Sequence, residues 1–182
     1  GRGYYSAAAG LLAPLVLGLA HLRAGRALWA GYGAVLVAAV LFMIYAQGAH
    51  GLVAVVALVA IVAVTDTAGY FAGRALGGPK FWPALSPNKT WAGLLGGIVG
   101  ATVWIVVWSY FVAPAMRGDA AAAIDITRFG QMLGLGALTA VAAQAGDFFE
   151  SWLKRKAGVK DSSKLIPGHG GVFDRTDGMI PV

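Results

Sequence analysis

Acidic, basic and hydroxyl side chains gather at the end of the last long apolar run of this sequence. Spacings of three, four and seven residues place four of them on one face of a helix, namely Asp147, Glu150, Ser151 and Lys154. Such a face suits a hard cation like Mg²⁺, which typically takes one or two carboxylates together with water and substrate phosphates. The alternative is a charge cluster at a helix end, held by a Glu150–Lys154 ion pair. The apolar residues directly before Asp147 favour the metal site, because they place it near the hydrocarbon boundary.

The segment from Ser151 to Asp177 has the composition of a phosphate-binding loop. Its basic residues are Lys154, Arg155, Lys156, Lys160, Lys164 and Arg175. It also contains His169 and Gly170 in a Gly-His-Gly-Gly sequence, where glycines let backbone N–H groups approach phosphate oxygens. Asp174 and Asp177 follow where another apolar run begins. A loop that only sets membrane topology would explain the cations but not the glycines, the histidine and the acids, so the segment predicts a polyphosphate site.

Two earlier segments carry polar residues that could join this site. Asp66 follows a long apolar run, and a carboxylate inside a span costs at least ~2.5–3.5 kcal/mol. It therefore predicts either a metal or substrate ligand, or a structural residue that forms an ion pair with Arg74 or a hydrogen bond to a neighbouring span, and the sequence leaves both open. Ser86 followed by Pro87 predicts the N-cap and first residue of a helix. That helix start could bind phosphate with the help of Lys89, or could be a cap alone.

The elements that position these residues are apolar runs. Five of them, at about 4–20, 27–46, 51–73, 93–113 and 131–150, can each cross a bilayer core of about 30 Å, and a sixth begins near residue 178. The chain is 58% hydrophobic and 12% charged, whereas soluble domains carry about 25% charged residues. We therefore predict an all-α, polytopic transmembrane helix bundle with about five complete spans and the start of a sixth. We expect residues 1–182 to form one membrane-embedded catalytic domain that is truncated at both ends.

Charge and small residues refine this prediction. The first, third and fifth loops carry eleven Lys and Arg residues and the other two carry two, so the positive-inside rule places the candidate site at the cytoplasmic face. A net charge of +6 on a membrane protein indicates anionic lipid rather than nucleic acid as a partner. Three GxxxG pairs favour close packing inside the chain over a homodimer interface, which stays an alternative. They are Gly93/Gly97, Gly96/Gly100 and Gly130/Gly134.

The pattern S-x-x-K-R-x4-K-D-x5-P-G-H-G-G-x2-D-R-x-D, from Ser151 to Asp177, resembles the signature of the phosphatidate cytidylyltransferase (CDP-diacylglycerol synthase) family. Residues 86–91 are similar to its S-P-x-K-T-W element, and Asp66 with Tyr70 resembles its D-x-x-A-Y stretch, although the alanine is shifted by one position. The resemblance covers roughly residues 60–182. Ala92 stands where the family often has Glu, so this chain lacks that carboxylate.

The resemblance implies transfer of a cytidylyl group from CTP to phosphatidate, giving CDP-diacylglycerol and pyrophosphate for phospholipid biosynthesis. It also implies an integral membrane protein, in a bacterial inner membrane, that uses Mg²⁺, either alone or with a second cation. The metal ligands would be Asp147 and Asp174, with Asp66 or Asp177 as a further ligand. The phosphate-binding residues would be Ser86, Lys89, Ser151, Lys154, Arg155, Lys160, Lys164, His169, Gly170 and Arg175, with Lys154 and Arg175 catalytic.

Three other interpretations stay open at this point. A CTP-dependent polyprenol or phytol kinase would share a cationic site but transfer the γ-phosphoryl group. A cation transporter would use Asp66 and Asp147 as intramembrane sites. A truncated, inactive piece of the enzyme is the third.

Overall fold

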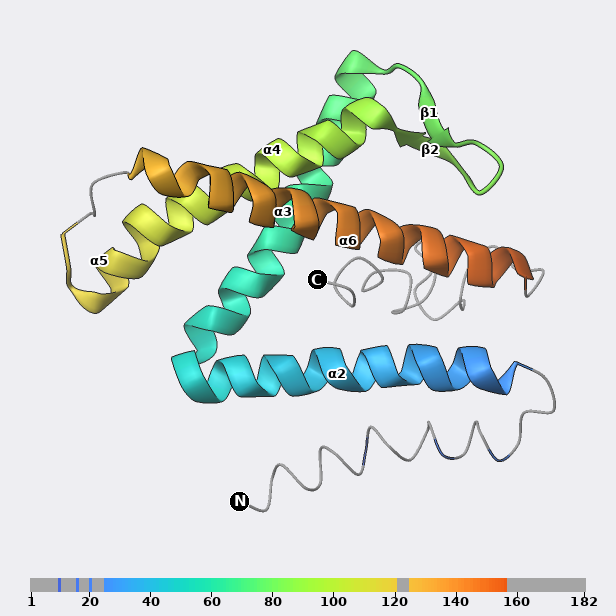
Figure 1. The fold of residues 1–182 in the computed structure, drawn as a ribbon, viewed down its shortest axis with the longest axis horizontal. Helices are drawn as coiled ribbons and strands as arrows, with labels where there is room; N and C mark the ends of the chain where they lie inside the picture. Colours follow the sequence, from blue (N-terminus) through green and yellow to red (C-terminus); the bar gives the residue numbers. More distant parts are fainter. Residues whose placement is uncertain (1–9, 11–15, 17–19, 21–24, 121–124, 157–182) are drawn as a thin grey trace, which may run out of the picture. The chain divides into compact units, whose positions relative to one another are not determined.

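A computed structural model describes residues 25–120 and 125–156, together with Gly10, Val16 and Ala20. The chain forms two compact units, residues 1–52 and residues 53–182. In the first unit the helix α2 spans Arg26–His50, between Gly25 and Gly51 with φ of 77° and 76° (Figure 1). Glycine adopts this left-handed conformation without the steric cost of a Cβ, so both glycines suit the ends of the helix.

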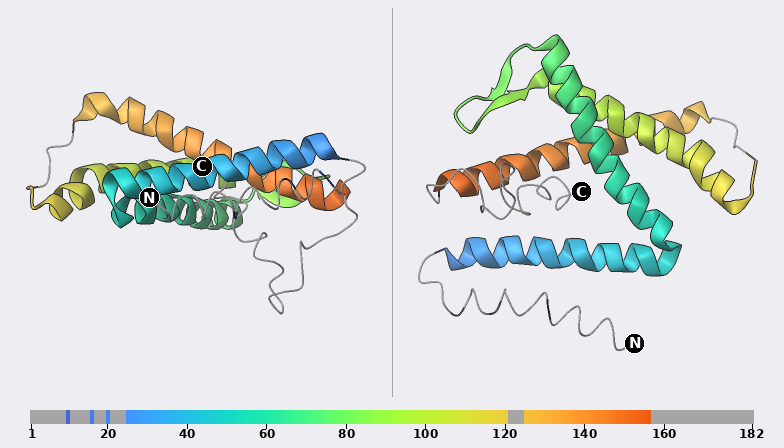
Figure 2. Two further views of the ribbon diagram at one scale, coloured as in Figure 1. Left: turned by 90° about the horizontal axis from the view of Figure 1, so that it is seen from below. Right: turned by 180° about the vertical axis from the view of Figure 1, so that it is seen from behind.

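The second unit contains the remaining elements. They are α3 (Leu52–Leu76), β1 (Lys80–Trp82), β2 (Ser86–Thr90), α4 (Trp91–Val107), a π-helical turn (Trp108–Val112), α5 (Ala113–Arg117), a 3-10 turn (Ile126–Arg128) and α6 (Phe129–Lys156). Figure 2 shows the same elements from below and from behind.

Four helical segments of the described residues are long and apolar enough to cross a membrane. They are Arg26–His50, Leu52–Leu76, Trp91–Arg117 and Ile126–Lys156. They confirm four of the five predicted runs as helices, as expected where lipid offers backbone groups no hydrogen-bond partner. The first predicted run, about 4–20, falls mostly outside the described residues, and the sixth lies wholly outside them.

The segment between α3 and α4 corrects two predictions. Strands β1 and β2 form an antiparallel hairpin in which Lys80 pairs with Thr90 and Trp82 with Ser86, so the second unit is not wholly α-helical. The prediction that Ser86 caps a helix is wrong, because Ser86 lies in β2. The N-cap of α4 is Thr90, whose hydroxyl oxygen accepts a hydrogen bond from the Gly93 N–H at 3.1 Å.

The incorrect prediction of a helix start at Ser86 has a physical reason. Proline fixes φ and lacks an N–H, and both properties suit a strand of a two-stranded ribbon as well as the first turn of a helix. Gly77 and Gly78, with φ of 62° and 95°, follow the end of α3 and turn the chain back. This turn lets residues 80–82 and 86–90 pair, so tertiary context selects the strand.

Helices α3 and α4 approach closely through small residues. A Cβ added at Gly96 would lie 2.2 Å from the Ala72 Cβ, and one at Gly100 would lie 2.5 Å from the Ala68 Cβ. A Cβ at Gly93 would lie 3.0 Å from the Gly69 carbonyl oxygen. The Gly93/Gly97 and Gly96/Gly100 pairs therefore pack inside the chain, as predicted.

Helix α6 also packs closely against α4 through small residues. A Cβ at Gly136 would lie 2.3 Å from the Thr102 Oγ1 and 2.8 Å from the Thr102 backbone nitrogen, and Ala140 contacts the Gly97 position. By contrast, no described atom lies within 4 Å of a Cβ at Gly130 or Gly134, so this third pair does not pack within the described part of the chain. These close approaches fix how α3 and α6 lie against α4, and so which of their residues meet.

Gly136→Ala is expected to lower the free energy of unfolding by ~1–3 kcal/mol, because the methyl group would collide with the Thr102 backbone. Gly134→Ala is the matched control on the same helix and is expected to be neutral or slightly stabilising, since alanine favours helix over glycine. The thermal midpoint of the detergent-solubilised protein measures both. Equal losses in the two variants would contradict the α4–α6 packing described here.

Candidate active site

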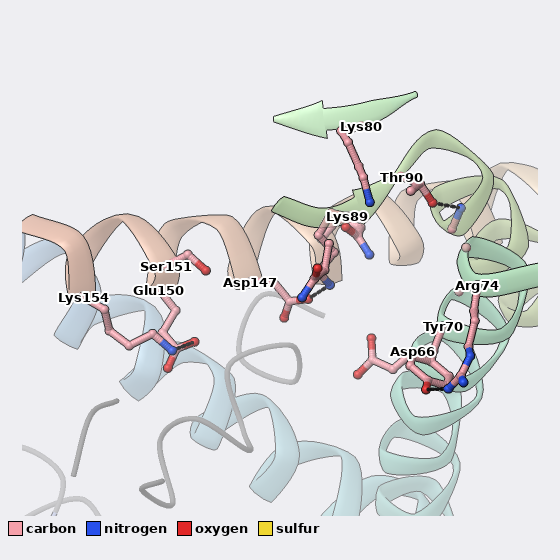
Figure 3. Close-up of a pocket in the computed structure, with 15 residues that line it drawn as sticks. Asp66, Tyr70, Arg74, Lys80, Lys89, Thr90, Asp147, Glu150, Ser151 and Lys154 are labelled. Carbon is pink, nitrogen blue, oxygen red and sulfur yellow. Dashed lines mark hydrogen bonds and ion pairs between the residues drawn. The ribbon is translucent and has the colours of Figure 1, made fainter. Parts of the chain in front are cut away.

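A cavity of about 710 Å³ lies in the second unit, where the C-terminal half of α3, the hairpin, the start of α4 and the second half of α6 meet. Its charged lining residues are Asp66, Arg74, Lys80, Lys89, Asp147, Glu150 and Lys154. Figure 3 shows these side chains projecting from three sides: α3, the hairpin, and α6. The excess of cations over acids in this lining suits anionic groups.

The centre of the cavity is an ion pair between the hairpin and α6. The Lys89 ammonium donates a hydrogen bond to Asp147 Oδ2, across 58 residues of sequence. The two side chains are 31% and 18% exposed, so both charges are partly withdrawn from water. Such a pair is stronger than one on an open surface, because water screens it less. It joins the predicted phosphate-binding lysine to the predicted metal ligand.

The second half of the α6 face forms one end of the cavity. Lys154 Nζ lies 3.0 Å from Glu150 Oε2, with the side chains 20% and 3% exposed. The helix-end ion pair, which was the alternative for this stripe, is therefore present. It lies inside the cavity together with Ser151 rather than on a solvated helix end.

The opposite end is built by α3, where Asp66, Tyr70 and Arg74 succeed one another at single-turn intervals and all line the cavity (Figure 3). Arg74 Nη1 donates a hydrogen bond to the Tyr70 hydroxyl at 2.8 Å. The anticipated ion pair between Arg74 and Asp66 is not formed in this arrangement. Asp66 lines the cavity, and its role as a metal or substrate ligand stays a prediction.

Two of the four predicted metal ligands, Asp66 and Asp147, border the same cavity. No group of three acids or histidines arranged to hold a metal occurs among the described residues. Two carboxylates nevertheless fit Mg²⁺, which typically completes its octahedral shell with water and substrate phosphates. The other two predicted ligands, Asp174 and Asp177, lie outside the described residues.

The structure brings together five of the residues that the sequence assigned to the site. They are Asp66, Lys89, Asp147, Ser151 and Lys154. Ser86 pairs with Trp82 in the hairpin, and Arg155 is exposed at the end of α6; neither borders the cavity. The remaining assigned residues lie outside the described part of the chain. They are Lys160, Lys164, His169, Gly170, Asp174, Arg175 and Asp177.

Arg74 and Lys80 are cavity residues to which the sequence assigned no role in the site. A signal existed for Arg74, because it continues the four-residue spacing that begins at Asp66 and Tyr70. Lys80 carried no such signal. Only its pairing with Thr90 in the hairpin brings it beside the start of α4.

Comparison with known proteins identifies the family of this chain. Residues 5–182 match the model of a family described as the Cytidylyltransferase family. The chain is 47% identical over 117 residues to a phosphatidate cytidylyltransferase of Brucella melitensis, covering 64% of this chain and 38% of that protein. It is 41% identical over 130 residues to one of Haemophilus influenzae, covering 71% and 43%.

A third relative, a phosphatidate cytidylyltransferase of Staphylococcus haemolyticus, is 35% identical over 136 residues, covering 75% of this chain and 48% of the relative. The matched residues thus span less than half of the length of each of these three relatives. The family match itself extends over nearly the whole chain, including the residues that form the cavity. The chain belongs to the cytidylyltransferase family.

Proposed function

We propose that this chain forms the catalytic core of an integral membrane enzyme that transfers a cytidylyl group from CTP to phosphatidate, giving CDP-diacylglycerol and pyrophosphate. The observation that carries the proposal is the cavity at the ends of apolar helices, where Lys89 and Asp147 meet among further cations and acids. The names of the similar proteins support the same reaction.

The reaction needs charge neutralisation more than it needs a base. A phosphate oxygen of phosphatidate attacks the α-phosphorus of CTP, the bond from that phosphorus to the bridging oxygen breaks, and pyrophosphate leaves. The attacking oxygen is already ionised, so no strong general base is required. Both substrates are anions, so the lysines and arginine of the cavity would contribute by positioning them and stabilising the developing charge.

Asp147 and Asp66 are the described residues that would hold Mg²⁺, with Asp174 and Asp177 as the further ligands that the sequence suggests. When bound, the ion would neutralise the triphosphate and the departing pyrophosphate. Lys89 has a specific part in this arrangement, because its ammonium already binds Asp147. Asp147 would be released to a cation when Lys89 turns from the carboxylate to a phosphate, so the pair would couple the two binding events.

The membrane supplies the second substrate in this proposal. The acyl chains of phosphatidate would stay in the bilayer while the phosphate reaches the cavity at the helix ends. The concentration of Lys and Arg in the odd loops supports a cytoplasmic position for this end, and the bacterial relatives support an inner membrane. Homodimer formation also stays a prediction.

The products of the wild-type protein test the function. The full-length protein in detergent, given CTP labelled at the α-phosphorus, phosphatidate and Mg²⁺, is expected to yield a labelled CDP-lipid and unlabelled pyrophosphate. Chelation of Mg²⁺ is expected to stop the reaction. Labelled CDP with a phosphorylated polyprenol or phytol would instead establish a lipid kinase. Cation flux in liposomes without any CTP turnover would establish a transporter.

A further inference from the structure

The four cations of the cavity differ in what neutralises them. Lys89 is paired with Asp147, and Lys154 is paired with Glu150. Arg74 donates to a neutral hydroxyl, that of Tyr70, and among the described residues neither Arg74 nor Lys80 forms an ion pair with a carboxylate. The two cations of the cavity that pair with no described carboxylate therefore lie on α3 and β1, at an end to which Asp66 contributes one acid.

We propose that Tyr70, Arg74 and Lys80 form a separate subsite for the phosphate of the lipid substrate, while the nucleotide phosphates occupy the Lys89–Asp147–Lys154 side. This inference rests on the proposed function, because it divides that function's two substrates between the two ends of one cavity. Arg74 and Lys80 contact the lipid phosphate directly in this arrangement, whereas Tyr70 is a positioning residue.

The chemistry of a phosphomonoester fits this end of the cavity. A guanidinium presents a planar fork of N–H donors that binds two phosphate oxygens at once, and a nearby ammonium adds a point charge. The Tyr70 hydroxyl accepts one Arg74 N–H at 2.8 Å, which orients the guanidinium and leaves further donors for a phosphate. Lys80 approaches from β1, on the hairpin side of the same cavity (Figure 3).

The acids of the cavity are unevenly distributed: α6 carries Asp147 and Glu150, whereas α3 carries Asp66 alone, whose carboxylate points toward the Asp147 side in Figure 3. A nucleoside triphosphate arrives with a divalent cation, and that cation requires carboxylates, which α6 supplies through Asp147. A lipid phosphate without its own metal is bound best by unpaired cations. The end that holds Arg74 and Lys80 offers these, so the charges assign the lipid to α3 and the nucleotide to α6.

The surroundings of Arg74 also suit a substrate that stays in the bilayer. Phe71 lies one turn before Arg74 on α3, and its side chain is 63% exposed within the described structure. Its ring packs edge-on against Tyr70, at 5.5 Å between centroids. On a span, exposed apolar side chains contact lipid, so acyl chains at this face would carry their phosphate directly to the guanidinium.

Steady-state kinetics of the full-length protein in phosphatidate-containing mixed micelles test this assignment. Arg74→Gln is expected to raise the apparent KM for phosphatidate by about 10- to 100-fold, with the KM for CTP changed less than about twofold, because a charge-assisted bidentate contact to one substrate is lost. Arg74→Lys is expected to recover part of the loss. Arg117→Gln removes an exposed arginine that pairs with Asp119 outside the cavity, and is expected to change neither constant.

Tyr70→Phe removes only the hydroxyl and tests the positioning role in a protein that keeps the aromatic packing. It is expected to raise the KM for phosphatidate a few-fold at unchanged KM for CTP. A variant that raises the KM for CTP as much as that for phosphatidate would overturn the assignment. So would unchanged kinetic constants in Arg74→Gln, or a loss of thermal stability as its only effect.

A binding experiment separates this inference from the proposed function. The thermal midpoints of the wild-type protein and of Arg74→Gln are measured at rising concentrations of one ligand at a time. The ligands are short-chain dihexanoyl phosphatidate, inorganic phosphate, and CTP with Mg²⁺. If Arg74→Gln loses the stabilisation by phosphatidate but keeps the stabilisation by CTP with Mg²⁺, the lipid subsite is supported, even if the wild type fails to make CDP-lipid. Loss of the CTP response instead would place a nucleotide phosphate at Arg74 and overturn it, whatever the turnover of the wild type.

Discussion

Asp147→Asn is expected to reduce CDP-lipid formation by at least ~100-fold at saturating substrates, since single groups that stabilise transition-state charge contribute factors of this size. The substitution preserves the size of the side chain and leaves an oxygen that can still accept a hydrogen bond from Lys89, so the packing of α6 against the hairpin is retained. What it removes is the negative charge that would ligate a cation. The loss should therefore appear in turnover and in the dependence on Mg²⁺, and the thermal midpoint should fall less than in Lys89→Ala because the hydrogen bond to Lys89 is kept.

Asp119→Asn is the matched control for this prediction. Asp119 is an exposed acid that also pairs with a basic side chain, Arg117, but it does not border the cavity. Its substitution is expected to leave turnover within about twofold of wild type, since isolated surface ion pairs contribute little. Near wild-type turnover of Asp147→Asn would disprove the metal assignment. The same assay applied to Asp174→Ala tests the second ligand that the sequence suggests.

The Lys89–Asp147 pair permits a second prediction, in which stability and turnover respond differently. Lys89→Ala removes the ammonium that pairs with the partly buried Asp147 carboxylate. The free energy of unfolding should fall by ~1–3 kcal/mol, a loss between those typical of surface and of buried ion pairs. Turnover should fall by ~100-fold as well, because a cation that binds phosphate is lost.

Exchanging the two charges separates the two effects. The double variant Lys89→Asp with Asp147→Lys is expected to recover most of the thermal stability lost in either single charge reversal, because an ion pair can form again across the same positions. Turnover should stay near background, because an ammonium on α6 cannot ligate a metal and a carboxylate on the hairpin repels phosphate. Thermal midpoints and CTP turnover of all three variants measure this. Recovery of turnover would mean that only the pairing matters.

Local signals were sufficient for part of the site. The stripe from Asp147 to Lys154 depends only on the helical repeat, and the structure confirms that Asp147, Ser151 and Lys154 line one cavity. The same repeat connects Asp66 with Tyr70 and Arg74. The sequence suggested Arg74 only as an ion-pair partner of Asp66, because sequence alone does not tell which of two neighbours a guanidinium will bind.

Other local signals were ambiguous. Serine followed by proline is compatible with a helix N-cap and with an edge strand, and the pairing of β1 with β2 decided for the strand. The three GxxxG pairs look alike in sequence, yet Gly93/Gly97 and Gly96/Gly100 pack against α3 while Gly130/Gly134 meets no described atom. Close helix packing requires a complementary small surface on the partner, which the pattern of one helix does not contain.

By itself, the sequence determined that this chain is built around long apolar helices, and it identified the polar face of α6. Both follow from rules that act within a few turns of chain: lipid forces apolar segments into helices, and the helical repeat aligns residues three and four apart. Only the tertiary structure decided that Lys89 meets Asp147 across 58 residues and that Lys80 joins the cavity. These contacts depend on where glycines let α3, α4 and α6 cross and on the register of a short hairpin, which no local pattern specifies.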